Sequence, residues 1–176
     1  VEVLEDPEIE KVGAKLKASA VALERFSVSL SGASFDVTIA SYVLDSGRRA
    51  HDLGALCQDF RGFSLLPYND VVGTGKKRVS FAEIEQTVAG NYAGRQVDSA
   101  LRLAERFTSD LEAQSLSGLF NDLEMPLVPV LAKMEREGIR IDADFFQEMS
   151  ERLDRDLTLI REEIHKVAGE EFNLNS

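Results

Sequence analysis

The stretch that follows Asp142 constrains the fold most, because its apolar residues repeat with the period of a helix. From Met149 they advance by steps of 4, 4, 3, 4 and 3, through Leu153, Leu157, Ile160 and Ile164 to Val167. This spacing places them on one face of an α-helix. Asp142 is a favourable N-terminal cap and Gly169 a favourable terminator. The sequence therefore predicts a long amphipathic helix from Asp142 to Ala168, the longest or nearly the longest of the chain.

Similar start and stop signals predict that most of the remaining chain is helical. Pro7 suits the first turn of a short helix that ends near Lys11, and Ser80 with Glu83 forms a capping box that predicts a helix to about Gly90. Further helices are predicted at Leu16–Phe26, from the cap Asp36 to Leu44, at His51–Phe60, at Met125–Glu137, and from Tyr92 to about Ser109 with an apolar stripe of Leu101, Ala104, Phe107 and Leu111. We expect roughly 60% helix, against the usual third.

Strands are few in this pattern. A brief strand is predicted at "KVG", Lys11–Gly13, and another ends at Asp36. Two or three short strands cannot form a sheet that is stable alone. We therefore expect them either to pair with strands absent from this sequence or not to be true strands. The Gly- and Pro-rich stretch from Arg61 to Arg78 is predicted to be a loop.

Composition limits the class of protein. Hydrophobic residues make up 44% of the chain, which is enough for a packed core. No apolar run approaches the roughly 18 residues of a membrane span, and no signal peptide is recognisable, so we expect no membrane partner. Cys57 is the single cysteine, which fits a reducing compartment such as the cytoplasm.

The net charge of −11 argues against a strong DNA-binding domain, although other domains could hold the DNA. Three small basic clusters interrupt the acidic chain: Lys11, Lys15 and Lys17; Arg48 and Arg49; and Lys76, Lys77 and Arg78. The third, in "VVGTGKKR", lacks the context of a phosphate-binding loop. It reads as a basic loop tip or as a weak contact to a single strand's backbone.

Titratable residues show no recognisable metal or catalytic pattern on their own. His51 and His165 are far apart on separate predicted helices, so no zinc spacing exists. Asp36 and Asp52 stand at predicted helix starts, where a carboxylate satisfies free backbone N–H groups. Capping is the better interpretation of both residues.

Two stretches resemble a known family. Leu119–Ser176, with "EMPL" and "AGEEFNLNS", resembles the start of the polymerase region in the bacterial DNA polymerase I (family A) enzymes. Leu4 to about Leu116, with "LEDPEIEKVGAKLK", "FDVTIASYVLDS", "HDLGALC" and "YNDVVGTGKKRVSF", resembles the second half of the family's 3′–5′ exonuclease domain. The resemblance implies a mainly helical fragment: the C-terminal part of a ribonuclease-H-like fold over residues 1–117, followed by thumb-base helices over residues 118–176.

The resemblance also implies that the nuclease site is degenerate. Active members hold two metal ions with four carboxylates, of which one ends an Asn-Leu-Lys-Tyr/Phe-Asp run and another follows a tyrosine by four residues. Here the first run begins at Lys15 and ends at Ser19, and the carboxylate position after Tyr92 is Gln96. Arg95 adds positive charge to the same region. The Asp-x-Glu of the family's first strand is not in the sequence, so we expect no metal site and no catalytic residue here.

The expected role is therefore that of a structural part of a DNA-directed DNA polymerase, monomeric and acting at the bacterial nucleoid. DNA would be bound, and Mg²⁺ used, by the parent's polymerase domain, with Lys15, Lys17 and Arg95 as weak candidates for DNA contacts. One alternative is a working proofreading exonuclease in which Asp98 or Asp36 replaces the missing ligands. Another is a free-standing helical interaction module.

Overall fold

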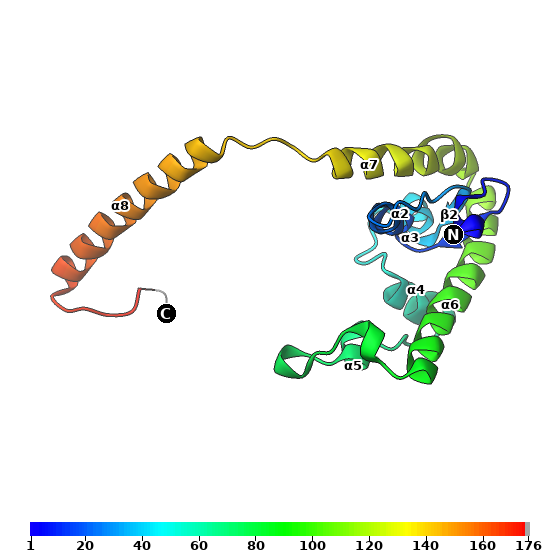
Figure 1. Ribbon diagram of the computed structural model, residues 1–176, viewed down its shortest axis with the longest axis horizontal. Helices are drawn as coiled ribbons and strands as arrows, with labels where there is room; N and C mark the ends of the chain where they lie inside the picture. The colour runs from blue at the N-terminus through cyan, green and yellow to red at the C-terminus, as the bar shows by residue number, and fades with distance from the viewer. Residues whose placement is uncertain (175–176) are drawn as a thin grey trace. The chain divides into compact units, whose positions relative to one another are not determined.

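Helices account for 67% of the computed structural model, which describes residues 1–174 (Figure 1). The predicted dominance of helices is thus confirmed. The chain forms two compact units, one from Val1 to Glu137 and one that begins at Gly138. The predicted boundary after residue 117 separates two domains of the family and stays a prediction. The packed units divide the chain elsewhere, after Glu137.

The two predicted strands exist and pair with each other. β1 (Lys11–Gly13) and β2 (Ala33–Asp36) form a parallel pair in which Val12 lies opposite Phe35. The crossover between them contains α2 (Leu16–Glu24). The expectation that the strands would need absent partners, or would not be strands, is therefore wrong. A helical crossover brings two short parallel segments together within the same stretch of chain.

Asp36 ends β2 and caps two helices at once. Its carboxylate accepts hydrogen bonds from the backbone N–H of Thr38 at 2.9 Å, at the start of α3 (Val37–Leu44). It also accepts from the N–H groups of Lys15 at 3.2 Å and Leu16 at 2.6 Å, at the start of α2. The side chain is almost completely buried, at 1% exposure. The predicted cap of α3 is confirmed, and the second helix is an addition that local sequence could not reveal.

The first predicted helix is wrong in its position. α1 (Glu2–Glu5) precedes Pro7, and Lys11 belongs to β1. The Asp6 carboxylate accepts from the backbone N–H of Glu8 at 2.9 Å, which stabilises a turn there instead of a helix start. The next predicted cap behaves as expected: Asp52 accepts from the N–H of Ala55 at 3.2 Å and opens α4 (Leu53–Arg61).

The predicted loop between α4 and the long helix contains short helical turns. These are α5 (Tyr68–Val72) and the 3₁₀ turn η1 (Gly75–Lys77). A second 3₁₀ turn, η2 (Phe81–Glu83), follows where a helix was predicted from Ser80. The capping box at Ser80 and Glu83 is confirmed: the Glu83 carboxylate accepts from the N–H of Ser80 at 2.8 Å, and the Ser80 hydroxyl accepts from the N–H of Ala82 at 3.3 Å. It opens only a single turn.

α6 (Gln86–Ala113) is one continuous helix, and the prediction of two helices separated near Gly90 is wrong. It starts at Glu85, whose carboxylate accepts from the N–H groups of Thr87 and Val88, both at 3.0 Å. These hydrogen bonds lower the pKa of Glu85, and the bond from Thr87 has the largest effect. The predicted inward stripe is correct except for Leu101, which is 50% exposed, because Ala100 and Leu103 occupy the inward positions beside it.

The first unit continues beyond α6 into a π-helical turn, η3 (Leu119–Glu124), and α7 (Met125–Glu137). Phe120 packs against Phe35 of β2 with ring centroids 4.7 Å apart. α7 lies against α2, and its buried residues are Met125, Val128 and Ala132. Two ion pairs join these helices, Lys17 with Glu135 and Arg136 with Glu24. Residues 118–137 are therefore an integral part of the first unit.

The second unit contains α8 (Ala143–Ala168), which confirms the predicted helix and both of its ends. Asp142 accepts from the N–H of Phe145 at 3.0 Å, and Gly169 has a φ of +77°. With 26 residues α8 is second only to α6 with 28 among the described helices. No α8 residue is buried, so its apolar stripe lies exposed within this unit. Along residues 1–174, no helix is long and apolar enough to cross a membrane.

Candidate functional site

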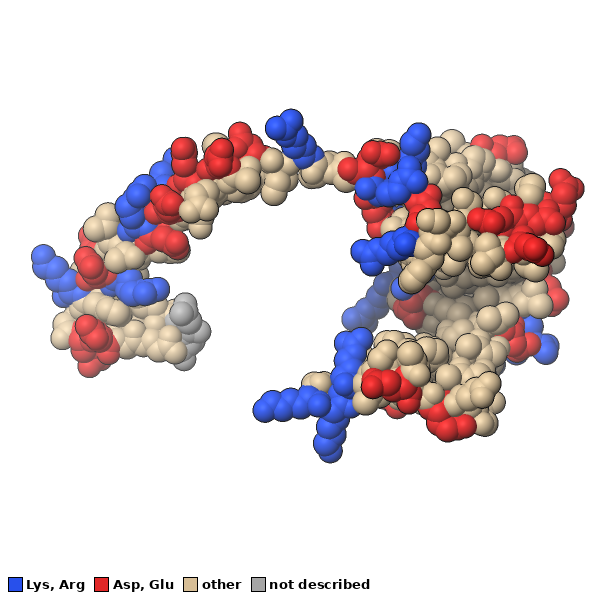
Figure 2. Space-filling view, in the orientation of Figure 1, with Lys and Arg blue, Asp and Glu red and all other residues tan. Residues whose placement is uncertain are grey.

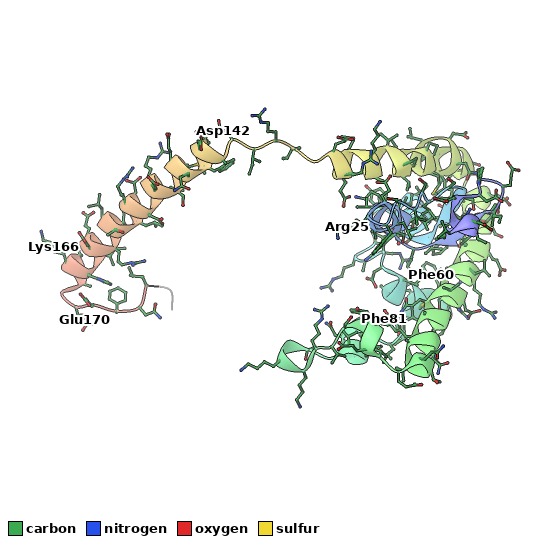
Figure 3. The ribbon with its side chains drawn as sticks, in the orientation of Figure 1. Arg25, Phe60, Phe81, Asp142, Lys166 and Glu170 are labelled. Atoms are coloured by element: carbon green, nitrogen blue, oxygen red, sulfur yellow. The ribbon has the colours of Figure 1, made fainter. Side chains whose placement is uncertain are left out.

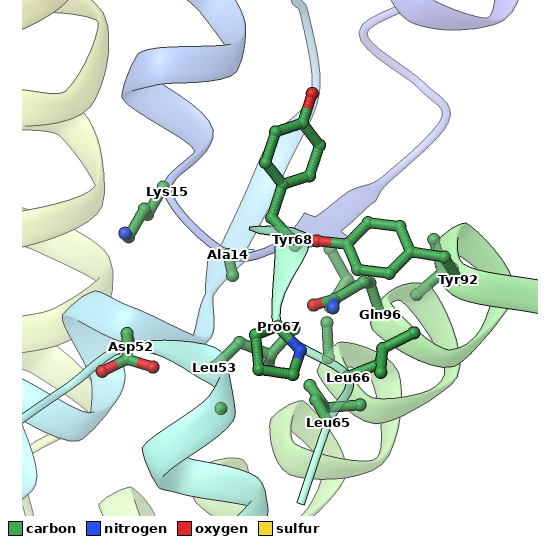
Figure 4. Close-up of a pocket in the computed structure, with 15 residues that line it drawn as sticks. Ala14, Lys15, Asp52, Leu53, Leu65, Leu66, Pro67, Tyr68, Tyr92 and Gln96 are labelled. Atoms are coloured by element: carbon green, nitrogen blue, oxygen red, sulfur yellow. The ribbon is translucent and has the colours of Figure 1, made fainter. Parts of the chain in front are cut away.

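A cleft of about 640 Å³ lies in the first unit, where β1, the start of α2, the segment before α5 and the N-terminal half of α6 meet (Figure 4). Its walls are largely apolar, from Val12, Leu53, Leu65, Leu66 and Pro67. Five side chains carry the polar chemistry of the cleft: Lys15, Asp52, Tyr68, Tyr92 and Gln96.

Tyr92 and Gln96 enter this cleft from one face of α6. They are four residues apart, which is one helical turn, so both side chains point the same way. Both are half-buried and line the cleft. The Tyr92 ring packs against Tyr68 at 6.1 Å and against Phe81 at 5.9 Å between centroids. These contacts fix the position of the tyrosine.

Lys15 reaches the cleft from the start of α2, opposite Gln96 in Figure 4. Its backbone is in the left-handed region, with φ 58°, which is uncommon for a residue with a side chain. The Asp36 carboxylate holds that conformation by accepting the N–H groups of Lys15 and Leu16. The buried carboxylate thus fixes the backbone at Lys15, whose exposed side chain stands at the edge of the cleft.

The other predicted residues are not gathered at this point. Ser19 lies one turn further along α2, is exposed and does not line the cleft. Lys17 is paired with Glu135 of α7. Arg95 lines a neighbouring groove of about 460 Å³ that also contains Tyr92 and Gln96. The structure therefore brings Lys15, Tyr92 and Gln96 together, with Arg95 adjacent, and leaves Ser19 and Lys17 outside.

The candidate substitute carboxylates are already engaged. Asp36 is buried and accepts three backbone N–H groups. Asp98 accepts from Arg102 at 2.8 Å and pairs with Arg61 at 3.5 Å, on a face of α6 that does not line the cleft. The hydrogen bond from Arg102, more than the charge of Arg61, lowers the pKa of Asp98.

Comparison with known proteins decides the family. Residues 1–101 match the family described as DNA polymerase I, ribonuclease H-like domain. This chain belongs to the DNA polymerase I family. It is similar to the DNA polymerase I of Pseudomonas aeruginosa, at 38% identity over 99% of this chain and 19% of the relative. It is also similar to that of Bacillus subtilis, at 34% identity over 91% of this chain and 18% of the relative. The chain spans about a fifth of the length of these relatives.

A solved structure supports the fold of this DNA polymerase I family chain. It is described as the POL domain of Pol1 from M. smegmatis in complex with DNA primer-template and dNTP. The match has a TM-score of 0.73 at 20% identity and covers 99% of this chain and 27% of the other.

The donors in the cleft do not fit the two metal ions implied by the nuclease resemblance. Hard divalent cations need several oxygen ligands, of which carboxylates are the strongest. The cleft offers one carboxylate, Asp52, which already caps α4, together with the neutral amide of Gln96 and the ammonium of Lys15. Among residues 1–174, no three His, Cys, Asp or Glu side chains are grouped so that they could hold a metal ion.

Sequence reasoning missed the residues that complete the cleft from the loop side. Tyr68 and Phe81 form an aromatic cluster with Tyr92, and Tyr68 also lines the cleft. Tyr68 stands in the stretch predicted to be a loop, and Phe81 at the start of the helix predicted from the Ser80–Glu83 capping box. The only local signal was the occurrence of aromatic residues among Gly, Pro and Asn, which does not show that their rings meet.

Proposed function

We propose that this chain is part of a DNA-directed DNA polymerase, in which its nuclease-like portion serves as a scaffold without 3′–5′ exonuclease activity. Family membership supports the first half of the proposal. The primer-template and nucleotide in the description of the similar polymerase structure point to DNA as partner of the parent protein. Because this chain spans about a fifth of its relatives, DNA synthesis and the Mg²⁺ it would use belong to the parent.

One observation supports the proposed lack of nuclease activity: Lys15 and Gln96 line the same cleft as Tyr92. A two-metal mechanism requires anionic ligands that hold both ions beside the phosphate. An ammonium group repels divalent cations, and an amide oxygen is a poor replacement for a carboxylate. Tyr92 then lacks a metal-bound water to orient.

The scaffold role rests on the packing of α7. Its buried face and the two ion pairs with α2 attach residues 125–137 to the nuclease-like portion. In this proposal the nuclease-like portion supports the first helices of the polymerase portion, and the loss of its metal ligands leaves that support intact.

The test is an exonuclease assay on a 3′-labelled single-stranded oligonucleotide with Mg²⁺ or Mn²⁺. We expect no release of nucleotide and no two-ion isotherm in a Mn²⁺ titration. The double variant Ser19→Asp/Gln96→Asp should also remain inactive, because Lys15 still lies in the cleft. Metal-dependent release that is lost in Tyr92→Phe would contradict the proposal and favour a working exonuclease.

A binding measurement tests the cleft separately. We expect affinity for a short single strand weaker than roughly 10⁻⁴ M at about 0.15 M salt, because the metal ions that attract the backbone would be missing. Micromolar binding that disappears when Lys15, Lys17 and Arg95 are neutralised would mean that the nuclease-like portion still holds DNA and is more than a scaffold.

A further inference from the structure

The segment from Gly73 to Val79, here named the basic loop, is closed by its own backbone bonds. The N–H of Val79 donates to the carbonyl of Val72 at 2.9 Å, across the base of the loop. Inside it, the N–H groups of Lys77 and Arg78 donate to Thr74 at 3.2 Å and Gly75 at 3.3 Å. Gly73 has a φ of +79°, and a Cβ there would lie 2.9 Å from the Lys77 carbonyl oxygen. The loop therefore has a defined shape that requires glycine at its base.

Aromatic packing attaches both ends of the basic loop to α6. Tyr68 precedes the loop and Phe81 follows it, and their rings stack at 6.0 Å between centroids. Both rings also contact Tyr92 of α6. Ser80 and Glu83 fix the exit from the loop through their capping box. The tip is thus held at a defined place on the first unit.

Three consecutive cations occupy the far side of this loop. Lys76, Lys77 and Arg78 are all exposed, and Figures 2 and 3 show basic side chains spreading outward from the tip. Within residues 1–174 none of them forms an ion pair, whereas Lys17, Arg102 and Arg106 do. The acidic residues that follow the loop, Glu83 and Glu85, do not pair with these cations, because their carboxylates accept hydrogen bonds from backbone N–H groups.

We propose that the basic loop binds the phosphate backbone of duplex DNA. The chain as a whole carries −11, so the remaining surface repels DNA and an approach is favoured only where cations are left unneutralised. A duplex presents about one negative charge per 1.7 Å along its axis, which suits three cations held close together. Lysine and arginine contacts to phosphates position a duplex without reading its sequence.

The same structure favours a duplex over a single strand. Binding of single strands depends on aromatic rings that are free to stack on bases. The rings nearest the basic loop, Tyr68, Phe81 and Tyr92, are packed on one another. The choice of DNA as the bound polyanion rests on the proposed function. The binding site itself is the basic loop and not the degenerate cleft.

The test is fluorescence anisotropy of the complete 176-residue chain with a labelled duplex, at salt concentrations from about 0.015 to 0.15 M. Three phosphate contacts predict a slope of log K against log salt near −2.7, which is about 500-fold over this range. The variant Lys76→Ser/Lys77→Ser/Arg78→Ser should lose about 100-fold or more in affinity at the lowest salt and show a slope near zero. Its thermal unfolding should be unchanged, because these side chains are exposed.

A control with the same change in charge is Arg102→Ser/Arg106→Ser/Lys133→Ser, all exposed on α6 and α7. It should bind the duplex within a factor of about 10 of the unaltered chain, because its cations are not grouped on one tip. The proposal is overturned if the unaltered chain does not bind at the lowest salt, if the loop variant keeps its slope, or if the control loses as much. Equal binding of a single strand or of polyglutamate would overturn the assignment to duplex DNA. Nuclease inactivity is judged separately by hydrolysis and metal titration.

Discussion

Asp36 is the residue on which we expect the first unit to depend most. Its buried carboxylate accepts three backbone N–H groups at the starts of two helices. Asp36→Ala would leave these donors unpaired at a buried site, at a cost on the order of 3 kcal/mol in the free energy of unfolding. Urea denaturation monitored by circular dichroism would measure this loss of stability. Asp52→Ala, which removes one bond at one helix, should cost about 1 kcal/mol. Equal losses in the two variants would contradict this account.

Asp98 gives a prediction that depends on pH. The hydrogen bond from Arg102 lowers its pKa below the ordinary 3.8. A carboxylate with a lowered folded pKa stabilises the fold above the unfolded pKa, and this contribution is lost as pH falls through the folded value. We expect an NMR titration of the Asp98 carboxyl carbon to have its midpoint below 3.8, and Arg102→Gln to move it upward. Arg106→Gln, whose partner is Asp110, should leave it unchanged.

At the scale of the element, α6 carries two glycines whose replacement should stabilise it. Gly90 and Gly94 lie inside the helix, and a Cβ on either would meet no atom within 4 Å. Alanine at each position should add about 0.5–1 kcal/mol, because glycine loses more backbone entropy in a helix. The midpoint temperature of thermal unfolding should rise by about 2–4 °C for each 1 kcal/mol of added stability. Gly32→Ala is the opposing control and should destabilise, since a Cβ there would lie 2.4 Å from the Ile9 carbonyl oxygen.

Comparison of sequence and structure shows which signals are local. The caps at Asp36, Asp52 and Asp142 were predictable, because a carboxylate and the N–H groups it accepts lie within three residues. The continuity of α6 through Gly90 was not predictable, since packing of its C-terminal half outweighs a glycine cost of about 1 kcal/mol.

The cleft was predictable only in part. Tyr92 and Gln96 share a helix face, so their spacing alone placed them together. The contribution of Tyr68 depends on how a Gly- and Pro-rich segment folds back on α6, which is a long-range contact. The parallel pairing of β1 with β2 was missed for the same reason, because neither strand carries a signal of its partner.

At the scale of the whole molecule, a cut at residue 117 should damage the first unit and a cut at residue 137 should not. The shorter piece loses the buried Phe120, Met125 and Val128, each worth about 1.5–3 kcal/mol when fully buried. Their sum approaches the stability of an ordinary domain. We expect residues 1–137 to unfold cooperatively in urea near the midpoint of the first unit in the full chain. Residues 1–117 should show no cooperative transition, and an unchanged midpoint would contradict this packing account.

The π-helical turn η3 determines which face of α7 turns toward the core of the first unit. Its inward residue Phe120 and the next one, Met125, are five positions apart, whereas an α-helix would return to the same face after three or four. Removing one residue from this turn would rotate α7 by about 100°. Val128 and Ala132 would then leave the surface of α2, and Glu135 and Arg136 would leave their ion-pair partners. The length of this turn should therefore tolerate less change during evolution than its amino-acid composition.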